Sequence, residues 1–459
     1  MKISPREAAA HALENILTFE RFSNRETGRW LEKGWWSPED QRLFLLLVYG
    51  SLEQLLQLDQ LISAHARRPV DKLDPFLRGI LRISVYQLCF TDRIPAYAVI
   101  NEAVELAKKK KPKAAGLVNA VLRAITRSGI KDKARNPIVD DDNLQALSLF
   151  YSHPQWLVEL LHQDYSWTDL KALLAAHQQP PSLTVRLNLL KGKKEELLFA
   201  ISQEGIELEP LGYIPEAFRV ITHQGLITNS DVYRRGLFHI QSLSSMMAVH
   251  WLDPQPGERI IDMAAAPGGK ATFIAQRMNG KGQVTARDIS ARRIQQIKEN
   301  AQRLGCNEII TCQEKDGRKP DPEMTHTADR VLLDAPCSSF GMIRKKPELK
   351  YIKNWQRLRE LPQLQYQMLE NAGKMVRNEG VLVYSTCTYL HRENDAVVER
   401  FLDNHPNFKL EPQMEKGTND FIINDLFTEK EASKGFIQLG PHIHLDFDGF
   451  FVARMKRTD

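Results

Sequence analysis

Two cysteines stand in polar segments that directly follow predicted buried strands. Cys337 comes after the apolar run 328–334, and Cys387 comes after the run 380–385. Strand-end loops carry a large share of catalytic residues, so either thiol is a candidate nucleophile. The other three cysteines lie in or beside apolar runs and are expected to be buried: Cys89, Cys306 and Cys312. No pair has the C-x-x-C spacing of a metal site, so no metal is predicted.

Four carboxylates lie at or just after predicted strand ends: Asp262, Asp288, Asp316 and Asp334. In a parallel sheet such positions line one crevice. Asp288, after the second strand, suits two ribose hydroxyls, because one carboxylate accepts both hydrogen bonds. Asp316, after the third strand, can accept from an exocyclic amine such as that of adenine. A single aspartate could equally be a loop N-cap, but four in register favour a nucleoside-binding crevice.

The segment 259–270 joins a short strand to a helix through small residues. It reads Arg-Ile-Ile-Asp-Met-Ala-Ala-Ala-Pro-Gly-Gly-Lys. The loop 264–270 lets the backbone approach a ligand closely, and its two glycines can adopt angles closed to other residues. The dinucleotide fingerprint Gly-x-Gly-x-x-Gly and the P-loop are both missing. A nicotinamide-dependent oxidoreductase is therefore not indicated.

Strands and helices alternate through 233–459, which predicts an α/β fold with a doubly wound, Rossmann-like sheet. Further strands are expected at 284–288, 309–312, 328–334 and 380–385. The main helices are expected at 291–304 and 356–378. Three apolar stretches close the chain and predict an antiparallel edge: 407–410, 435–439 and 449–454.

The region before this domain is predicted to have three parts. Residues 1–130 are expected to be all helical, starting at a proline-led N-cap, Ser4-Pro-Arg-Glu7. Further helices are expected at 38–66, 74–91, 95–109 and 113–127. Residues 131–150 are polar and predict a linker. Residues 151–232 predict a small α/β subdomain, in which Arg186 and Asn188 lie on the polar face of a strand.

The net charge of the 459 residues is +5, too weak to identify a nucleic-acid binder alone. The lysine run 108–111, with Lys113 and nearby arginines, is either a solvated helix end or a phosphate-contacting face. An odd number of cysteines favours a reducing cytosol. No apolar run has the length of a membrane span.

Three motifs together resemble the signatures of the RNA cytosine-C5 methyltransferases of the Sun/Fmu type. They are Asp262-Met-Ala-Ala-Ala-Pro-Gly-Gly-Lys270, Leu333-Asp-Ala-Pro-Cys-Ser338 and Tyr384-Ser-Thr-Cys-Thr388, in the order of the family. The N-terminal segments Asp92-Arg-Ile-Pro95 and Asn101-Glu-Ala103 resemble the NusB-like RNA-binding domain found in the rRNA small-subunit methyltransferase B group. The resemblance covers nearly the whole chain.

The resemblance implies a role for each motif residue. Cys387 is the expected nucleophile, Cys337 assists product release, Asp334 binds the cytosine, and Lys270 reaches the base or the cofactor. S-adenosylmethionine is the implied cofactor, with these expected contacts: Ala264, Ala265, Ala266, Pro267, Gly268, Gly269, Lys270, Asp288, Asp316 and Asp334. The flanking RNA is expected to contact five side chains: Arg186, Asn188, Gln241, Arg344 and Lys346.

The implied function is methylation of 16S rRNA at cytosine C5 by a cytoplasmic monomer. Two alternatives stay open: methylation of tRNA or another rRNA site, and an inactive RNA-binding assembly factor. Both candidate thiols and Asp334 are present, which favours activity. The sequence departs from the family pattern at Ala264, at Ala271 and at Arg287, and the last could alter the ribose pocket.

Overall fold

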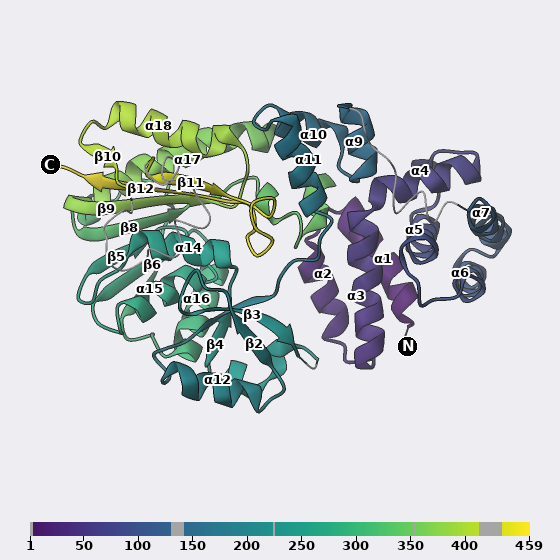
Figure 1. Cartoon of the computed structure of the whole chain (residues 1–459), viewed down its shortest axis with the longest axis horizontal. Helices are drawn as coiled ribbons and strands as arrows, with labels where there is room; N and C mark the ends of the chain where they lie inside the picture. The colour runs from purple at the N-terminus through teal and green to yellow at the C-terminus, as the bar shows by residue number, and fades with distance from the viewer. Residues whose placement is uncertain (1–2, 130–141, 224, 352–354, 413–433) are drawn as a thin grey trace. The chain divides into compact units, whose positions relative to one another are not determined.

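The computed structural model describes residues 3–129, 142–223, 225–351, 355–412 and 434–459, and the chain divides into two compact units (Figure 1). Unit 1 comprises Met1–Gln179 together with Ile343–Lys353. Unit 2 comprises Pro180–Met342 together with Asn354–Asp459. None of the helices in these described ranges has the length and apolar character that a membrane span needs.

Unit 1 is helical, as predicted. Ser4 Oγ accepts a hydrogen bond from the amide of Glu7 at 3.1 Å, which caps the first helix. The predicted helix 38–66 is two helices, because the chain turns at Gln54. The α-helices are α1 (Pro5–Thr18), α2 (Ser23–Leu31), α3 (Pro38–Glu53), α4 (Leu55–Ala66), α5 (Pro75–Phe90), α6 (Ala96–Lys110), α7 (Ala115–Arg127), α9 (Leu144–Phe150), α10 (Gln155–His162) and α11 (Trp167–Ala176).

Helices α1 and α5 approach closely in the core of unit 1. A Cβ on Gly79 of α5 would lie only 2.7 Å from the carbonyl oxygen of Ala10 on α1. Ala8, Ala9 and Ala12 of α1 are fully buried as well. Small side chains on both helices therefore set the distance between them.

The helices α9–α11 pack with unit 1, whereas the sequence placed 151–179 with the small α/β subdomain. The amide of Leu56 donates to Ser152 Oγ at 2.9 Å, and Gln54 donates to Gln178 at 2.6 Å. These two hydrogen bonds join the segment that carries α9–α11 to the start of α4 in unit 1. Of the predicted linker 131–150, residues up to 141 lie outside the described residues, and 144–150 is helix α9.

Unit 2 begins with a four-stranded antiparallel sheet in the order β2-β3-β1-β4. Its last strand, β4, lies beyond residue 232, where the subdomain was expected to end. One face is covered by α12, through Leu197 and Ile201. The elements are β1 (Thr184–Leu187), α12 (Lys194–Ser202), β2 (Glu207–Pro210), β3 (Ala217–Thr222), α13 (Asp231–Arg234) and β4 (Phe238–Ile240).

The larger sheet of unit 2 has eight strands, with β10-β12-β9-β8-β5-β6-β7 in line and β11 paired to β12. Strands β5 to β9 are parallel to one another, and β12 pairs antiparallel with β9, so that β10, β11 and β12 form the predicted antiparallel edge. The strands are β5 (Arg259–Asp262), β6 (Gln283–Asp288), β7 (Ile310–Glu314), β8 (Ala328–Asp334), β9 (Val376–Thr386), β10 (Phe408–Leu410), β11 (Phe436–Leu439) and β12 (Phe450–Arg457).

Helices cover both faces of this sheet (Figure 1). One buried cluster contains Phe273 of α15 and Ile297 of α16, and the other contains Leu369 of α17 and Phe401 of α18. The doubly wound α/β fold is therefore confirmed. The helices are α14 (Leu243–Leu252), α15 (Gly269–Arg277), α16 (Ala291–Leu304), α17 (Trp355–Met375) and α18 (Asp395–Asn404).

Candidate active site

The candidate site lies at the carboxyl ends of β5, β8 and β9. The strand order reverses between β5 and β8, and doubly wound sheets bind ligands at such a point. Asp334 and Ser385 are register partners on β8 and β9, and Ser385 Oγ donates to Asp334 Oδ1 at 2.9 Å. The two cysteine loops follow these two strands directly, so the parallel pairing brings them together.

The thiols of Cys337 and Cys387 are in contact, with their sulfur atoms 3.3 Å apart and no disulfide between them. Ser339 Oγ lies 3.5 Å from Cys387 Sγ. The hydrogen bond with Cys337, helped by Ser339 and Lys270, lowers the pKa of Cys387 despite its burial. The same hydrogen bond, together with burial, raises the pKa of Cys337 well above its usual range. These opposite shifts favour a thiolate at Cys387 and a protonated thiol at Cys337.

The loop after β8 packs tightly against the start of β12. Gly341 N donates to the carbonyl of Cys387 at 2.9 Å. A Cβ on Gly341 would lie 1.9 Å from the carbonyl oxygen of Gly449, so only glycine fits at this position. The close approach holds the two cysteine loops against each other.

Glu393 is a buried residue of the site that the sequence did not reveal. Its carboxylate accepts hydrogen bonds from the amide of Ser338 at 2.8 Å and from Gln365 Nε2 at 3.0 Å. Burial raises the pKa of this carboxyl group. Ser338 directly follows Cys337, so Glu393 fixes the backbone that carries the thiol. Its polar sequence context, His-Arg-Glu-Asn-Asp, carries no signal of burial.

We expect Glu393→Ala to destabilise unit 2 by about 1–3 kcal/mol, because the buried Ser338 amide loses its acceptor. That loss corresponds to a melting temperature lowered by roughly 2–10 °C. Thermal unfolding measured against Glu399→Ala, an exposed residue of the nearby helix α18, tests it. Equal melting temperatures for the two variants would refute this role for Glu393.

Lys270 and Asp334 form an ion pair at the carboxyl ends of β5 and β8, with Nζ and Oδ2 2.5 Å apart. Burial alone would lower the pKa of Lys270, but Asp334 and Asp262 outweigh it and raise that pKa. The Asp334 side chain is 28 % exposed, so it can still contact a ligand. The pair thus presents an acceptor and a donor beside the two thiols.

The loop 264–270 leads from β5 into α15. Gly268 has a φ of 103°, and a Cβ there would lie 3.2 Å from Ile297 Cα on α16. The small residue therefore allows the loop to pass close to the neighbouring helix. Because α15 begins at Gly269, its free N–H groups lie at the same edge of the sheet as Asp262.

The carboxylates at this edge fit S-adenosylmethionine. Asp262 is fully buried, and apart from the nearby amide of Ala264 its oxygens have no hydrogen-bond partner among the described residues. Burial raises the pKa of Asp262 to about 7. A buried carboxylate in need of donors suits the ammonium group of the cofactor. Asp288 is almost fully buried at the end of β6, where its Oδ1 accepts from the amide of Ser290 at 3.1 Å, and its contact with ribose stays a prediction.

Asp316 and Arg287 lie beside this edge. Asp316 is paired with Arg318 at 2.6 Å and lines a cavity of about 160 Å³. The hydrogen bonds with Arg318 lower the pKa of Asp316. Arg287 is paired with Asp321 at 2.8 Å and also contacts Gln313. The Arg287 side chain is thus paired away from Asp288 but lines the same cavity as Asp316, so its effect on the ribose pocket stays a prediction.

We expect Asp262→Asn to make the cofactor-free protein more stable above neutral pH. The folded-state pKa, about 7, lies above the ordinary value of 3.8, so the folded protein holds this proton more tightly than the unfolded chain does. Ionisation therefore costs stability as the pH rises towards about 7, and asparagine removes that cost.

Melting temperatures at about pH 5 and about pH 8.5 measure the effect, with the exposed Asp403→Asn as control. The gain from Asp262→Asn should be larger at the higher pH. The same variant should bind S-adenosylmethionine roughly ten- to a hundredfold more weakly, since a charged hydrogen bond is lost. A gain independent of pH would contradict the raised pKa.

Three of the residues expected to bind RNA are internal instead. Arg186 is 1 % exposed and donates to the carbonyl of Gly269 at 2.7 Å, and it also bonds to Gln241. Asn188 is buried and donates to the carbonyls of Gly236 and Leu304. The polar face of this strand packs on the larger domain rather than on solvent. Arg186, supported by Gln241, therefore holds the loop 264–270, Asn188 ties β1 to the ends of α13 and α16, and none of the three is available to RNA.

The basic segment after the Cys337 loop belongs to unit 1, and burial corrects the expectation for Arg344, while that for Lys346 stays a prediction. Arg344 is only 4 % exposed. Lys346 lies over the ring of Phe22, 5.7 Å from its centre. The segment is fixed to the helices by Lys350, which donates to the carbonyls of Glu53 and Ser152 at 2.9 and 2.8 Å. The Lys350 ammonium group thus joins the segment to unit 1.

The lysine run 108–111 is largely occupied by ion pairs. Lys109 and Lys110 both pair with the buried carboxylate of Glu7, and Lys111 pairs with Asp74 at 2.8 Å. Of the two interpretations left open by the sequence, the structure favours a helix end that stabilises the fold.

Family models match three consecutive parts of the chain. Residues 3–127 match the NusB family, and residues 153–225 match a ferredoxin-like domain of RsmF/B-like methyltransferases. Residues 249–456 match the model described as 16S rRNA methyltransferase RsmB/F. These ranges include every catalytic residue predicted above.

Similar proteins extend the likeness to the full chain. The probable ribosomal RNA small subunit methyltransferase B of Bacillus subtilis is 35% identical over 99% of both chains. Ribosomal RNA small subunit methyltransferase B of Yersinia pseudotuberculosis is 35% identical over 91% of both. The solved structure of PH0851 matches all of both chains with a TM-score of 0.79 and 27% identity.

Proposed function

This chain belongs to the RsmB/F family of 16S rRNA methyltransferases, which use S-adenosylmethionine, and on that premise we propose that it methylates C5 of a cytosine in 16S rRNA through a covalent adduct with Cys387. The observation that carries the proposal is the contact of two thiols with opposite pKa shifts beside Asp334 and Lys270. An inactive RNA-binding factor would have no need for such a pair.

The reaction requires a nucleophile because C5 of cytosine is itself a poor one. The Cys387 thiolate adds to C6, and the electron pair of the C5–C6 double bond moves to make C5 nucleophilic. Asp334 accepts a hydrogen bond from the exocyclic amine of the base, and also from N3, which takes up a proton as the thiolate adds and returns it when the thiolate leaves. Both contacts favour the electron-poor ring. Lys270 pairs with Asp334 and fixes the orientation of its carboxylate. The cytosine must leave any base stack to reach the thiolate.

The second half of the reaction restores the aromatic ring. S-adenosylmethionine supplies an electrophilic methyl group when it is bound by Asp262, Asp288 and the loop 264–270. Once Cys387 is bound to C6, the Cys337 thiol gives up its proton to solvent and its sulfur then takes the C5 proton, so that one proton leaves to solvent in each turnover. The electron pair left at C5 re-forms the double bond and expels the Cys387 thiolate. Both cysteines return to their starting state, so the cycle balances without an oxidant.

Nucleoside analysis of methylated RNA tests the proposal. We expect the protein, given S-adenosylmethionine and unmethylated 16S rRNA, to produce 5-methylcytidine in that RNA and not in tRNA. Labelling of tRNA alone would overturn the substrate, and a methylated nucleoside other than 5-methylcytidine would overturn the reaction. No labelling of either RNA would favour the assembly-factor alternative.

We further expect the chain to act as a cytoplasmic monomer, because its proposed substrate is an RNA of the cytoplasm and the catalytic residues all come from one chain. Light scattering at working concentration measures the mass directly. A stable dimer whose dissociation abolishes methylation would contradict this expectation.

A further inference from the structure

A groove lies between α6 and α7 of unit 1, in a part of the chain that the methyl-transfer chemistry does not use. Its volume is about 620 Å³, and side chains of both helices line it. The two helices pack against each other as neighbours (Figure 1). Side chains normally fill the space between packed helices, so a cavity of this size is a surface for a ligand.

One wall of the groove is an exposed aromatic ring. Tyr97 is 78 % exposed, more than any other large hydrophobic side chain in the described ranges. Its neighbours Ile100 and Val104 also line the groove. An exposed tyrosine beside apolar side chains offers a flat face, and unpaired nucleic-acid bases stack on such faces.

The charged lining of the groove is mainly positive. Lys108, Arg123 and Arg127 contribute three cations, against the single carboxylate of Glu105. Lys108 is paired with Glu105 at 2.7 Å, which leaves the two arginines. Neither arginine has a carboxylate partner in the part of the chain that the structure describes. Guanidinium groups match phosphate geometry well, so this wall suits a phosphodiester backbone.

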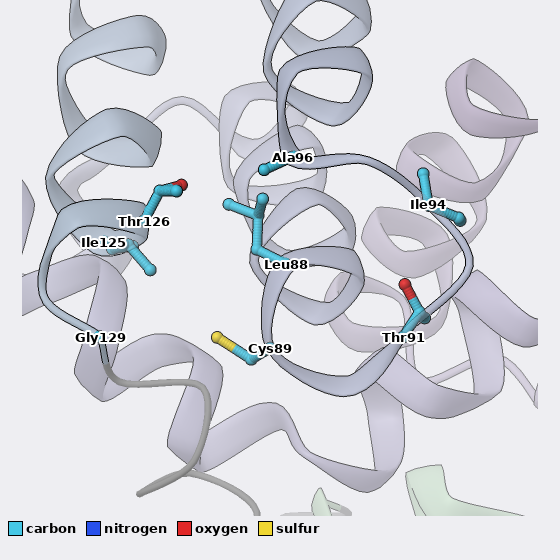
Figure 2. Close-up of a pocket in the computed structure, with 8 residues that line it drawn as sticks. All are labelled: Leu88, Cys89, Thr91, Ile94, Ala96, Ile125, Thr126 and Gly129. Atoms are coloured by element: carbon cyan, nitrogen blue, oxygen red, sulfur yellow. The ribbon is translucent and has the colours of Figure 1, made fainter.

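A small pocket adjoins the groove, since Ala96 and Thr126 line both (Figure 2). It has a volume of about 170 Å³, and Leu88, Ile94 and Ile125 form its apolar walls. The hydroxyl of Thr126 donates to the carbonyl of Leu122, so its oxygen remains able to accept from a base amine. A pocket well below the roughly 300–1,000 Å³ of drug-sized sites suits a single base.

We propose that the α6–α7 groove and its pocket bind an unpaired segment of RNA other than the target cytosine. One base stacks on Tyr97, the phosphates lie against Arg123 and Arg127, and a neighbouring base enters the pocket. An apolar helix of a protein partner would fill the groove but would bury both guanidinium charges without an anionic partner, since Arg123 bonds only to the neutral Asn119 among the described residues. The inference rests on the proposed function in one respect: that function identifies the bound nucleic acid as RNA.

The test measures binding to the full-length protein of a short, fluorescent, single-stranded RNA that contains no cytosine. We expect Tyr97→Ala to raise Kd roughly five- to a hundredfold through lost stacking. Arg123→Glu with Arg127→Glu should raise Kd at least about tenfold and reduce the slope of log Kd against log salt by about 1.4. Ala96→Leu, which narrows the pocket, should also weaken binding.

The matched control is Arg42→Glu with Arg68→Glu, which makes the same charge change at exposed positions of unit 1 outside the groove. The control should retain most of the affinity, and its melting temperature should match those of the groove variants. Unchanged binding by the groove variants, an equal loss in the control, or equal losses with duplex RNA would overturn the inference.

Formation of the Cys387 adduct on a cytosine-containing RNA at saturating concentration separates this inference from the proposed function. Groove variants should raise KM and leave the rate at saturation unchanged. If no adduct forms while the groove variants still lose binding to the cytosine-free RNA, the groove stands and the proposed function fails.

Discussion

Replacing Cys387 by alanine is expected to abolish methyl transfer, with an initial rate lowered by roughly 10⁴-fold or more. The variant keeps Asp334, Lys270 and the cofactor loop, so binding of S-adenosylmethionine should be unchanged. Only the group that makes C5 nucleophilic is lost. Transfer of a labelled methyl group to 16S rRNA, followed over time, measures the effect.

Cys312→Ala is the matched control, because Cys312 is a free, half-buried thiol on β7 and is not part of the crevice. It should retain nearly the parent rate. If Cys387→Ala keeps a tenth or more of the parent rate, Cys387 is not the nucleophile. A loss that also appears in cofactor affinity would indicate a disturbed fold instead.

Replacing Cys337 by alanine is expected to trap the protein on its RNA. Addition to C6 and methyl transfer can still occur, but removal of the C5 proton loses the sulfur assigned to it. The covalent complex should therefore accumulate to near one RNA per protein, and turnover should stop. A denaturing gel shows the complex as a slower band that requires S-adenosylmethionine.

The same variant carries a pH prediction. The hydrogen bond with Cys337 lowers the pKa of Cys387, so its removal should raise that pKa. The rate of adduct formation should then rise with pH along a curve displaced towards higher pH than in the parent. The double variant Cys337→Ala with Cys387→Ala should form no adduct. Release of methylated RNA at the parent rate would refute the role given to Cys337.

Much of this site could be predicted from sequence because strand ends in a parallel sheet share one edge. The runs before Asp262, Asp288, Asp334 and Cys387 are short, apolar and strand-like, so their ends could be placed together without coordinates. The two glycines of the loop 264–270 also predict a tight turn there, because they can adopt backbone angles closed to other residues. The close contact of Cys337 and Cys387 follows from the pairing of β8 with β9.

The failures have a common physical cause. Alternation along β1 distinguishes the polar face that bears Arg186, but it does not distinguish solvent from another polar layer of the same chain. Arg344 was expected to contact RNA because local pattern does not show which surfaces other parts of the chain cover. Its burial depends on contacts with helices far away in sequence. Glu393 was missed because its value as an acceptor appears only once the amide of Ser338 is placed.

The grouping of the helices 144–176 with unit 1 is a feature that local pattern does not give. The helices after Asn143 have ordinary amphipathic patterns, and no local signal says which core they join. Their attachment depends on single contacts such as the hydrogen bond from Leu56 to Ser152. Local pattern therefore identified the elements, while their grouping required the tertiary structure.

The most direct test of the central claim is to map the covalent bond formed with 16S rRNA that carries 5-fluorocytidine. Fluorine at C5 cannot leave as a proton does, so the adduct should persist after methyl transfer. Mass spectrometry of the digested complex should then identify the RNA on the peptide that contains Cys387. An adduct on Cys337, or no adduct under conditions that methylate ordinary 16S rRNA, would contradict the account.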